Sequence, residues 1–142
     1  MIPVFESIRL KVLIGLESLT PEGRTCAWQV LLGIDMEAPD IVKLRSDYWN
    51  IYMLNSEGAV PGSNQASIEK QLVKDCVRTF TEYKAFTQTA QSGQNRLFNV
   101  LKAYSLYDRE LGYTQGLNFI AAMILLKVSD ESLAFVVFTR IL

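Results

Sequence analysis

Apolar residues recur at helical spacing along almost the whole chain, and this pattern limits the fold more than any other feature of the sequence. From Ala27 to Ile34 and from Leu97 to Tyr104, apolar side chains follow the i, i+3, i+4 spacing of a helix that buries one face. No segment alternates apolar and polar residues as a half-buried strand does. The sequence therefore predicts an all-α domain whose helices pack irregularly rather than as a coiled coil.

Start and stop signals divide this pattern into separate helices. Thr20 precedes Pro21, which fits a first helical turn because proline's missing N–H has no partner there anyway. Ser67 is expected to cap a helix that ends near Cys76. The expected helices span residues 3–14, 21–32, 41–55, 68–76 and 95–107, one begins near 115, and the last covers 131–142. Residues 56–64 are expected to form a loop, and 79–94 a loop with at most one helical turn.

Composition excludes several functional classes. The 142 residues suffice for one domain or part of one, and 49% apolar residues suffice for a core. A net charge of −1 argues against general nucleic-acid binding, which needs a basic surplus. The chain has no histidine, so Ser-His-Asp and Cys-His catalysis are excluded within it. It also has no P-loop, so stable nucleotide binding by this chain is not expected.

Neither disulfide nor membrane-spanning signals are present. Cys26 and Cys76 form no CxxC pair and are predicted to be two buried, reduced thiols of a cytosolic protein. No apolar run reaches the roughly 18 residues needed to span a bilayer, and the N-terminus lacks a secretion-signal pattern. We therefore expect a cytoplasmic location without direct membrane insertion.

The last expected helix is almost entirely apolar and has no polar tail behind it. Its apolar residues include Leu133, Phe135, Phe138 and Leu142. This composition predicts that a further part of the protein covers the helix. An uncovered apolar helix would also favour self-association of the chain.

Two short motifs contain the residues best suited to chemistry. The first runs from Leu72 to Phe80 (LVKDCVRTF), and the second from Gly112 to Asn118 (GYTQGLN). Arg78 in the first is a permanent cation with a planar fork of donors, and Gln115 in the second is a neutral amide that donates and accepts at once. An arginine that offsets phosphate charge and a glutamine that holds an attacking water are the parts needed to help another protein hydrolyse GTP.

The two motifs resemble those of the TBC domain of Rab GTPase-activating proteins. Leu72, Asp75 and Arg78 stand at the spacing of the family's I-x-x-D-x-x-R motif. The second motif holds the residues of the family's Y-x-Q-G motif, which here are Tyr113, Gln115 and Gly116. The run RTCAWQVLLG (24–33) is similar to the family's opening signature, and further agreement lies at 97–104, Asn118, Glu131 and Ala134-Phe135. The resemblance thus covers most of the chain.

This resemblance implies a dual-finger mechanism acting in trans on a Rab-type small GTPase. Arg78 would lie against the transferring γ-phosphoryl group, and Gln115 would orient the attacking water in place of the GTPase's own glutamine. The partner would carry GTP and Mg²⁺, so this chain needs no cofactor or metal and has no hydrolase activity of its own. The resemblance also implies a role in vesicle trafficking, with recruitment to endomembranes through partners.

The resemblance gives supporting roles to five neighbours of the fingers: Asp75, Thr79, Gly112, Tyr113 and Gly116. Asp75 lies one helical turn before Arg78, from where it could orient the guanidinium or bond nearby backbone. The two glycines would allow a tight turn around Gln115 and close approach of the partner. Tyr113 would pack under the loop with its hydroxyl bonded.

The sequence departs from the family pattern at a few positions. Leu72 replaces the usual isoleucine and Leu117 the usual methionine, both changes that conserve volume. Thr81 stands where many members have proline, which would loosen the loop beside Arg78. A complete TBC domain continues into a second helical subdomain. Residues 1–142 are therefore expected to be the N-terminal part of a single TBC domain, truncated at its C-terminal end.

Other interpretations remain open at this stage. The chain could be a TBC-type scaffold that binds a GTPase or another protein without catalysis, or a helical domain that only assembles through its last helix. Taken alone, Arg78 would be an ordinary surface or salt-bridged arginine, and Gln115 an ordinary polar residue at a helix start. Four aromatic residues are expected to lie in the core rather than contact a ligand: Trp28, Trp49, Tyr104 and Tyr107.

Overall fold

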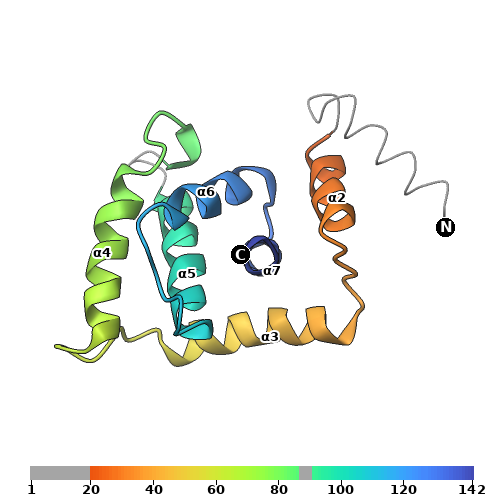
Figure 1. The fold of residues 1–142 in the computed structure, drawn as a ribbon. Helices are drawn as coiled ribbons and strands as arrows, with labels where there is room; N and C mark the ends of the chain where they lie inside the picture. The colour runs from red at the N-terminus through yellow and green to blue at the C-terminus, as the bar shows by residue number, and fades with distance from the viewer. Residues whose placement is uncertain (1–19, 87–90) are drawn as a thin grey trace.

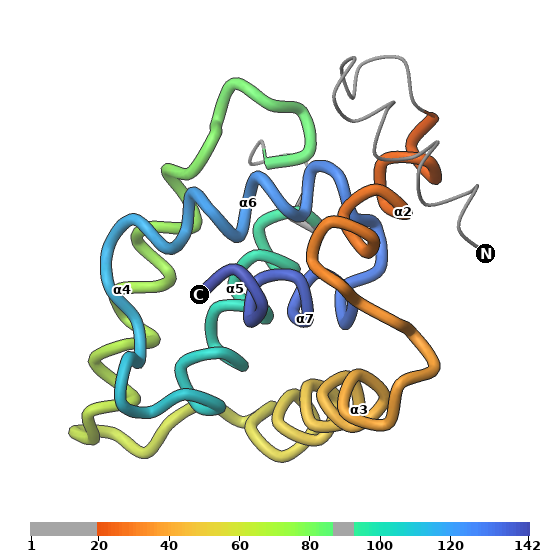
Figure 2. Tube along the Cα trace, turned by 45° about the vertical axis from the view of Figure 1, so that its right-hand side comes forward, coloured from red at the N-terminus to blue at the C-terminus, as the bar shows by residue number. Residues whose placement is uncertain are grey.

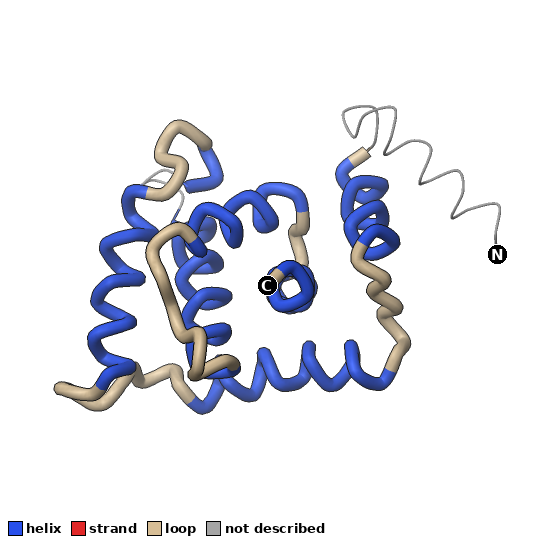
Figure 3. The backbone as a smooth tube through the Cα atoms, viewed as in Figure 1, coloured by secondary structure: helices blue, strands red, loops and turns tan. Residues whose placement is uncertain are grey.

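The computed structural model describes residues 20–86 and 91–142, and within these ranges the chain is helical and contains no strand. Figure 3 shows helices joined by loops and turns. The elements are α2 (Pro21–Leu31), α3 (Pro39–Leu54), α4 (Asn64–Arg78), the 3₁₀ turn η2 (Lys84–Phe86), α5 (Gln91–Tyr107), α6 (Leu117–Lys127) and α7 (Glu131–Ile141). The all-α prediction is confirmed, and the helix expected over residues 3–14 lies outside the described residues.

Helix α7 is the centre of the domain. Figure 1 looks along its axis, and α3, α5 and α6 all pack against it. Every residue from Leu133 to Phe138 is at most 3% exposed, as expected for a core helix that is apolar on all sides. The expectation that this helix lies uncovered is therefore wrong, because the chain's own helices cover it. Self-association remains a prediction, but it loses this apolar face as its support.

Polar groups at the start of α7 fix its direction. Asp130 caps the helix, and its Oδ1 accepts a hydrogen bond of 2.8 Å from the Leu133 N–H. The same carboxylate pairs with Arg45 of α3 at 2.9 Å. Glu131 accepts hydrogen bonds from Tyr48 of α3 and from Asn99 of α5. Burial of the apolar residues thus holds α7 in place, while these directional contacts set its orientation relative to α3 and α5.

Helices α4 and α5 each begin about one turn earlier than their sequence pattern predicts, whereas α3 begins two residues early, at Pro39. Helix α4 starts at Asn64 because the Ser63 hydroxyl accepts a hydrogen bond of 3.1 Å from the Ala66 N–H. Ser67, the predicted cap, lies inside the helix instead. Helix α5 starts at Gln91 rather than residue 95. In both cases the added first turn is polar, so apolar periodicity gives no sign of it.

Glycine is required where α5 approaches the turn η2. A Cβ built at Gly93 would lie only 1.7 Å from the Ala85 carbonyl oxygen. A side chain at this position would separate the two elements. The segment predicted as a loop over 79–94 contains both of them, the 3₁₀ turn and the start of α5, and they pack against each other.

Some predictions of burial are wrong. Tyr104 is buried and Trp28 half-buried, but Trp49 and Tyr107 are each 46% exposed. Cys76 is buried as predicted, whereas Cys26 is exposed. Cys26 lies on α2 beside Ala27, which is the residue of that helix that is fully buried. Among the residues that the structure describes, no helix is long and apolar enough to cross a membrane.

Candidate functional site

The two motifs meet where the end of α4 contacts the start of α6. The views in Figures 1 and 2 both place the last turn of α4 beside the N-terminal end of α6. Arg78 is the last residue of α4, and Gln115 lies two residues before α6 begins. Residues almost forty positions apart in the sequence therefore share one end of the domain.

Asp75 is the centre of the polar contacts between the motifs. Its side chain is 2% exposed and accepts hydrogen bonds from three side chains. Arg78 Nη2 donates to Oδ1 at 2.5 Å, and the Tyr113 hydroxyl donates to Oδ2 at 2.8 Å. Gln71 Nε2 lies 3.1 Å from each oxygen. A buried carboxylate supplied with this many donors is well satisfied in its charged form.

These contacts set the protonation states of the cluster. Burial alone would raise the pKa of the Asp75 carboxyl, but hydrogen bonds from Arg78, Tyr113 and Gln71 outweigh it, and the pKa lies below its ordinary value. Burial and the hydrogen bond to Asp75 raise the pKa of Tyr113. At neutral pH the cluster therefore holds an ionised Asp75 and a protonated Tyr113 that donates to it.

Arg78 is held at one point and otherwise exposed. Its ion pair with Asp75 uses Nη2, yet 61% of the arginine side chain is accessible to solvent. A guanidinium has five N–H donors in a rigid fork. The ion pair therefore restricts the direction of the side chain and leaves donors available on the outer side of the domain.

The chain turns sharply directly after Arg78. The buried Thr79 hydroxyl donates to the Asp75 carbonyl oxygen at 2.5 Å. Phe80 follows with φ of 46°, in the left-handed region, which costs roughly 1–3 kcal/mol for a residue other than glycine. Its ring packs against those of Tyr83 and Phe119, each with centroids 5.5 Å away. These aromatic contacts stabilise a strained turn beside the candidate finger.

The segment that carries Gln115 is bounded by two glycines with positive φ. Gly112 has φ of 60° and Gly116 has φ of 111°. Residues other than glycine adopt such backbone conformations only with strain. Because Gly116 is not helical, α6 begins at Leu117 rather than near Gln115 as the sequence pattern predicts. Gln115 itself is exposed.

A second buried polar contact joins the two motifs, through the side chain of Asn118. Asn118 is 3% exposed, and its Nδ2 donates to the Thr79 hydroxyl at 2.8 Å. Its Oδ1 accepts a hydrogen bond of 2.9 Å from the Gly116 N–H. Sequence reasoning included Thr79 but assigned no site role to Asn118 or to Gln71. The i, i+4 spacing of Gln71 and Asp75 was an available signal for Gln71.

Comparison with known proteins identifies the family. The model of the Rab-GTPase-TBC domain family matches residues 21–142. This chain belongs to that family. Rab GTPase-activating protein tbc-11 of Caenorhabditis elegans is 32% identical over 127 residues, which are 89% of this chain and 12% of that protein. Rab GTPase-activating protein eat-17 of the same organism is 35% identical over 120 residues, 84% of this chain and 12% of that protein.

A shorter and stronger match is the Ecotropic viral integration site 5 ortholog of Drosophila melanogaster. It is 43% identical over 77 residues, which are 54% of this chain and 9% of that protein. The chain spans about a tenth of the length of the curated relatives it matches. The comparison thus shows the family of this chain and not its activity.

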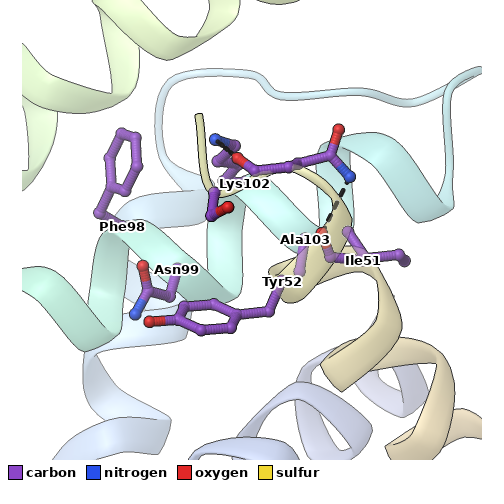
Figure 4. Close-up of a pocket in the computed structure, with 8 residues that line it drawn as sticks. Ile51, Tyr52, Phe98, Asn99, Lys102 and Ala103 are labelled. Carbon is purple, nitrogen blue, oxygen red and sulfur yellow. Dashed lines mark hydrogen bonds between the residues drawn. The ribbon is translucent and has the colours of Figure 1, made fainter. Parts of the chain in front are cut away.

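Two hollows among the described residues lie away from the fingers. A cavity of about 150 Å³ lies between α3 and α5, and Figure 4 shows Tyr52 on one side and Lys102 on the other. The Lys102 ammonium is already engaged, because it donates to the Asn55 carbonyl at 2.6 Å and pairs with Glu69 at 3.2 Å. A wider, mostly apolar hollow of about 580 Å³ lies between α2 and α6. Neither hollow is lined by Arg78 or Gln115.

Proposed function

We propose that this TBC domain accelerates GTP hydrolysis by a Rab-type small GTPase, to which it supplies Arg78 and Gln115 in trans. The observation that carries the proposal is that two exposed side chains are held by buried polar contacts. Both side chains are exposed, and both stand on segments joined by buried polar contacts through Asp75 and Asn118. An ordinary surface arginine and glutamine need no such support, whereas catalytic groups that act on a partner do.

Arg78 has the properties needed to stabilise charge on a transferring phosphoryl group. Its charge is permanent, and its planar fork matches phosphate oxygens in a way that lysine does not. Charge accumulates on these oxygens and on the leaving oxygen in the transition state. An arginine held in place before the partner arrives stabilises that charge without reorganising during the reaction.

Gln115 is suited to hold the attacking water. Its amide carbonyl accepts a hydrogen bond from a water proton while the NH₂ group donates elsewhere. The amide does not titrate, so the same role is available at any physiological pH. In this proposal GTP and Mg²⁺ belong to the partner, and the TBC domain itself holds no cofactor or metal.

The test is single-turnover GTP hydrolysis by a panel of purified Rab proteins. We expect wild-type protein to accelerate one or a few Rabs, and Arg78→Ala and Gln115→Ala each to lose most of that effect. Arg109→Ala is the matched control, because Arg109 is also an exposed arginine but belongs to neither motif. Wild-type protein that is folded and accelerates no Rab would refute the proposal.

A transition-state mimic separates catalysis from simple binding. A catalyst binds the transition state more tightly than the ground state, so Rab bound to GDP and aluminium fluoride should bind the TBC domain more tightly than Rab bound to GDP. Arg78→Ala should remove that difference. Equal affinity for the two forms, with wild-type protein, would favour a non-catalytic scaffold.

A further inference from the structure

We infer that Asn118 is a positioning residue that fixes the two fingers relative to each other, an inference that rests on the proposed function. Its amide group reaches the residue that directly follows each finger. On one side it contacts Thr79, which follows Arg78, and on the other it contacts Gly116, which follows Gln115. One buried side chain therefore bridges the backbone segments that carry both fingers.

The orientation of the Asn118 amide is determined by its partners. The Gly116 N–H is a donor only, so it must face Oδ1, and the NH₂ group must then face the Thr79 hydroxyl. The Thr79 hydroxyl donates its own proton to the Asp75 carbonyl and accepts from Asn118 with its oxygen. Each of these donors and acceptors has one matching partner, so the bridge holds a single arrangement.

Asn118 acts on the peptide unit of Gln115 itself. The Gly116 N–H belongs to the peptide bond that follows Gln115, so the hydrogen bond to Asn118 fixes the plane of that peptide. Gly116 has φ of 111° and would otherwise be free to rotate. Tyr113 holds the segment two residues before Gln115 through its bond to Asp75. Gln115 is thus held from both sides, and Asn118 provides the hold on the α6 side.

Loss of this bridge should lower the rate of GTP hydrolysis rather than weaken binding of the Rab. Asn118 and Thr79 are 3% and 0% exposed, so neither offers a surface to the partner. A misplacement of about 1 Å at a catalytic group costs roughly 10²-fold in rate. We expect Asn118→Ala and Thr79→Val to lower kcat by about 10-fold to 100-fold, with KM for the Rab nearly unchanged.

The experiment compares variants that remove the bridge with variants that keep it. Thr79→Val removes the accepting hydroxyl at nearly constant volume, whereas Thr79→Ser retains it and should restore most of kcat. Ser105→Ala is the matched stability control. Ser105 is 2% exposed on α5, and its hydroxyl both donates to the Lys102 carbonyl and accepts from Gln65. Its loss should lower stability to a similar degree without changing kcat.

A second readout does not depend on any GTPase. Hydrogen exchange at the Gly116 amide, followed by NMR, should accelerate in Asn118→Ala and stay unchanged in Ser105→Ala. Unchanged exchange would overturn the bridge even if the protein proves to be an activator. Normal kcat in Thr79→Val and Asn118→Ala, with active wild type, would overturn the positioning role. If wild type accelerates no Rab, the proposed function fails and the positioning role fails with it, while exchange at Gly116 still reports on the bridge.

Discussion

The centre of this TBC domain and its finger end are built on opposite principles. Around α7 the buried side chains from Leu133 to Phe138 are apolar, and packing against three other helices holds them. At the junction of α4 and α6, by contrast, the buried groups include Asp75, Thr79 and Asn118. Burial of apolar area is strong but non-directional, while hydrogen bonds are individually modest and directional. The first kind of contact stabilises the fold, and the second aims individual side chains.

This contrast predicts that activity and stability can be removed separately. Arg78→Ala should lower the stimulated hydrolysis rate by roughly 10³–10⁵, the range known for arginine fingers. Stability should fall by about 1–3 kcal/mol, because Asp75 is 2% exposed and loses its charged partner. The protein should still fold, because Tyr113 and Gln71 continue to donate to the same carboxylate. Single-turnover hydrolysis and chemical denaturation of the same preparation measure both quantities. An Arg78→Ala protein that unfolds, or that remains fully active, would contradict the prediction that activity can be lost without loss of the fold.

A truncation in the core should instead lower mainly the stability of the protein. Phe135 is fully buried, and its ring lies 5.1 Å from that of Tyr48 and 5.7 Å from that of Tyr107. Phe135→Ala should lower the free energy of unfolding by about 3–5 kcal/mol. Phe119→Ala removes the same side chain at the finger end, where it is 45% exposed, and should cost much less. Similar losses in urea denaturation for the two variants would show that the two regions are not organised differently.

Acid should destabilise the protein through one carboxylate in each region. The pKa values of Asp75 and Asp130 both lie below the ordinary value of 3.8 in the folded protein. Stability from these groups is therefore present above that pH and is lost as the pH falls through their folded pKa values. Asp75→Asn and Asp130→Asn should each flatten the fall in unfolding free energy over this acidic range.

Their effects on the reaction should differ. At neutral pH, Asp75→Asn removes the charge that orients Arg78 and should lower the stimulated hydrolysis rate. Asp130→Asn keeps a good helix cap far from the fingers and should leave that rate unchanged. An Asp75→Asn protein with normal rates and an unaltered acid profile would show that this carboxylate holds neither the fold nor the finger.

The sequence was sufficient for the helical class and for most helices, because apolar spacing reports directly on which faces are buried. It was insufficient for the coverage of α7, since an all-round apolar helix looks the same whether its own chain or another covers it. The bridge from Asn118 to Thr79 was also hidden, because it joins residues 39 positions apart. Only the packing of α4 on α6 brings that pair together, and periodicity within either helix contains no trace of it.

The start of α4 was also not predictable from apolar spacing, because its first turn is polar. Substitutions there give the smallest effect that we predict. Ser63→Ala removes the hydroxyl that accepts from the Ala66 N–H and should cost about 1 kcal/mol of stability. Ser67→Ala changes an exposed residue inside the first turns of α4 and should be neutral or slightly stabilising, because alanine favours helices. Thermal denaturation of the two variants compares the observed start of α4 with the predicted one.

Neither serine variant should alter stimulated hydrolysis. Helix α4 has 15 residues, so its start lies roughly 20 Å from Arg78 at its end. A larger loss of stability from Ser67→Ala than from Ser63→Ala would place the helix start where apolar spacing alone puts it. A loss of activity from Ser63→Ala, with the protein still folded, would mean that the fingers depend on the whole length of α4. The separation of core and finger end would then have to be redrawn to include the loop over 56–63.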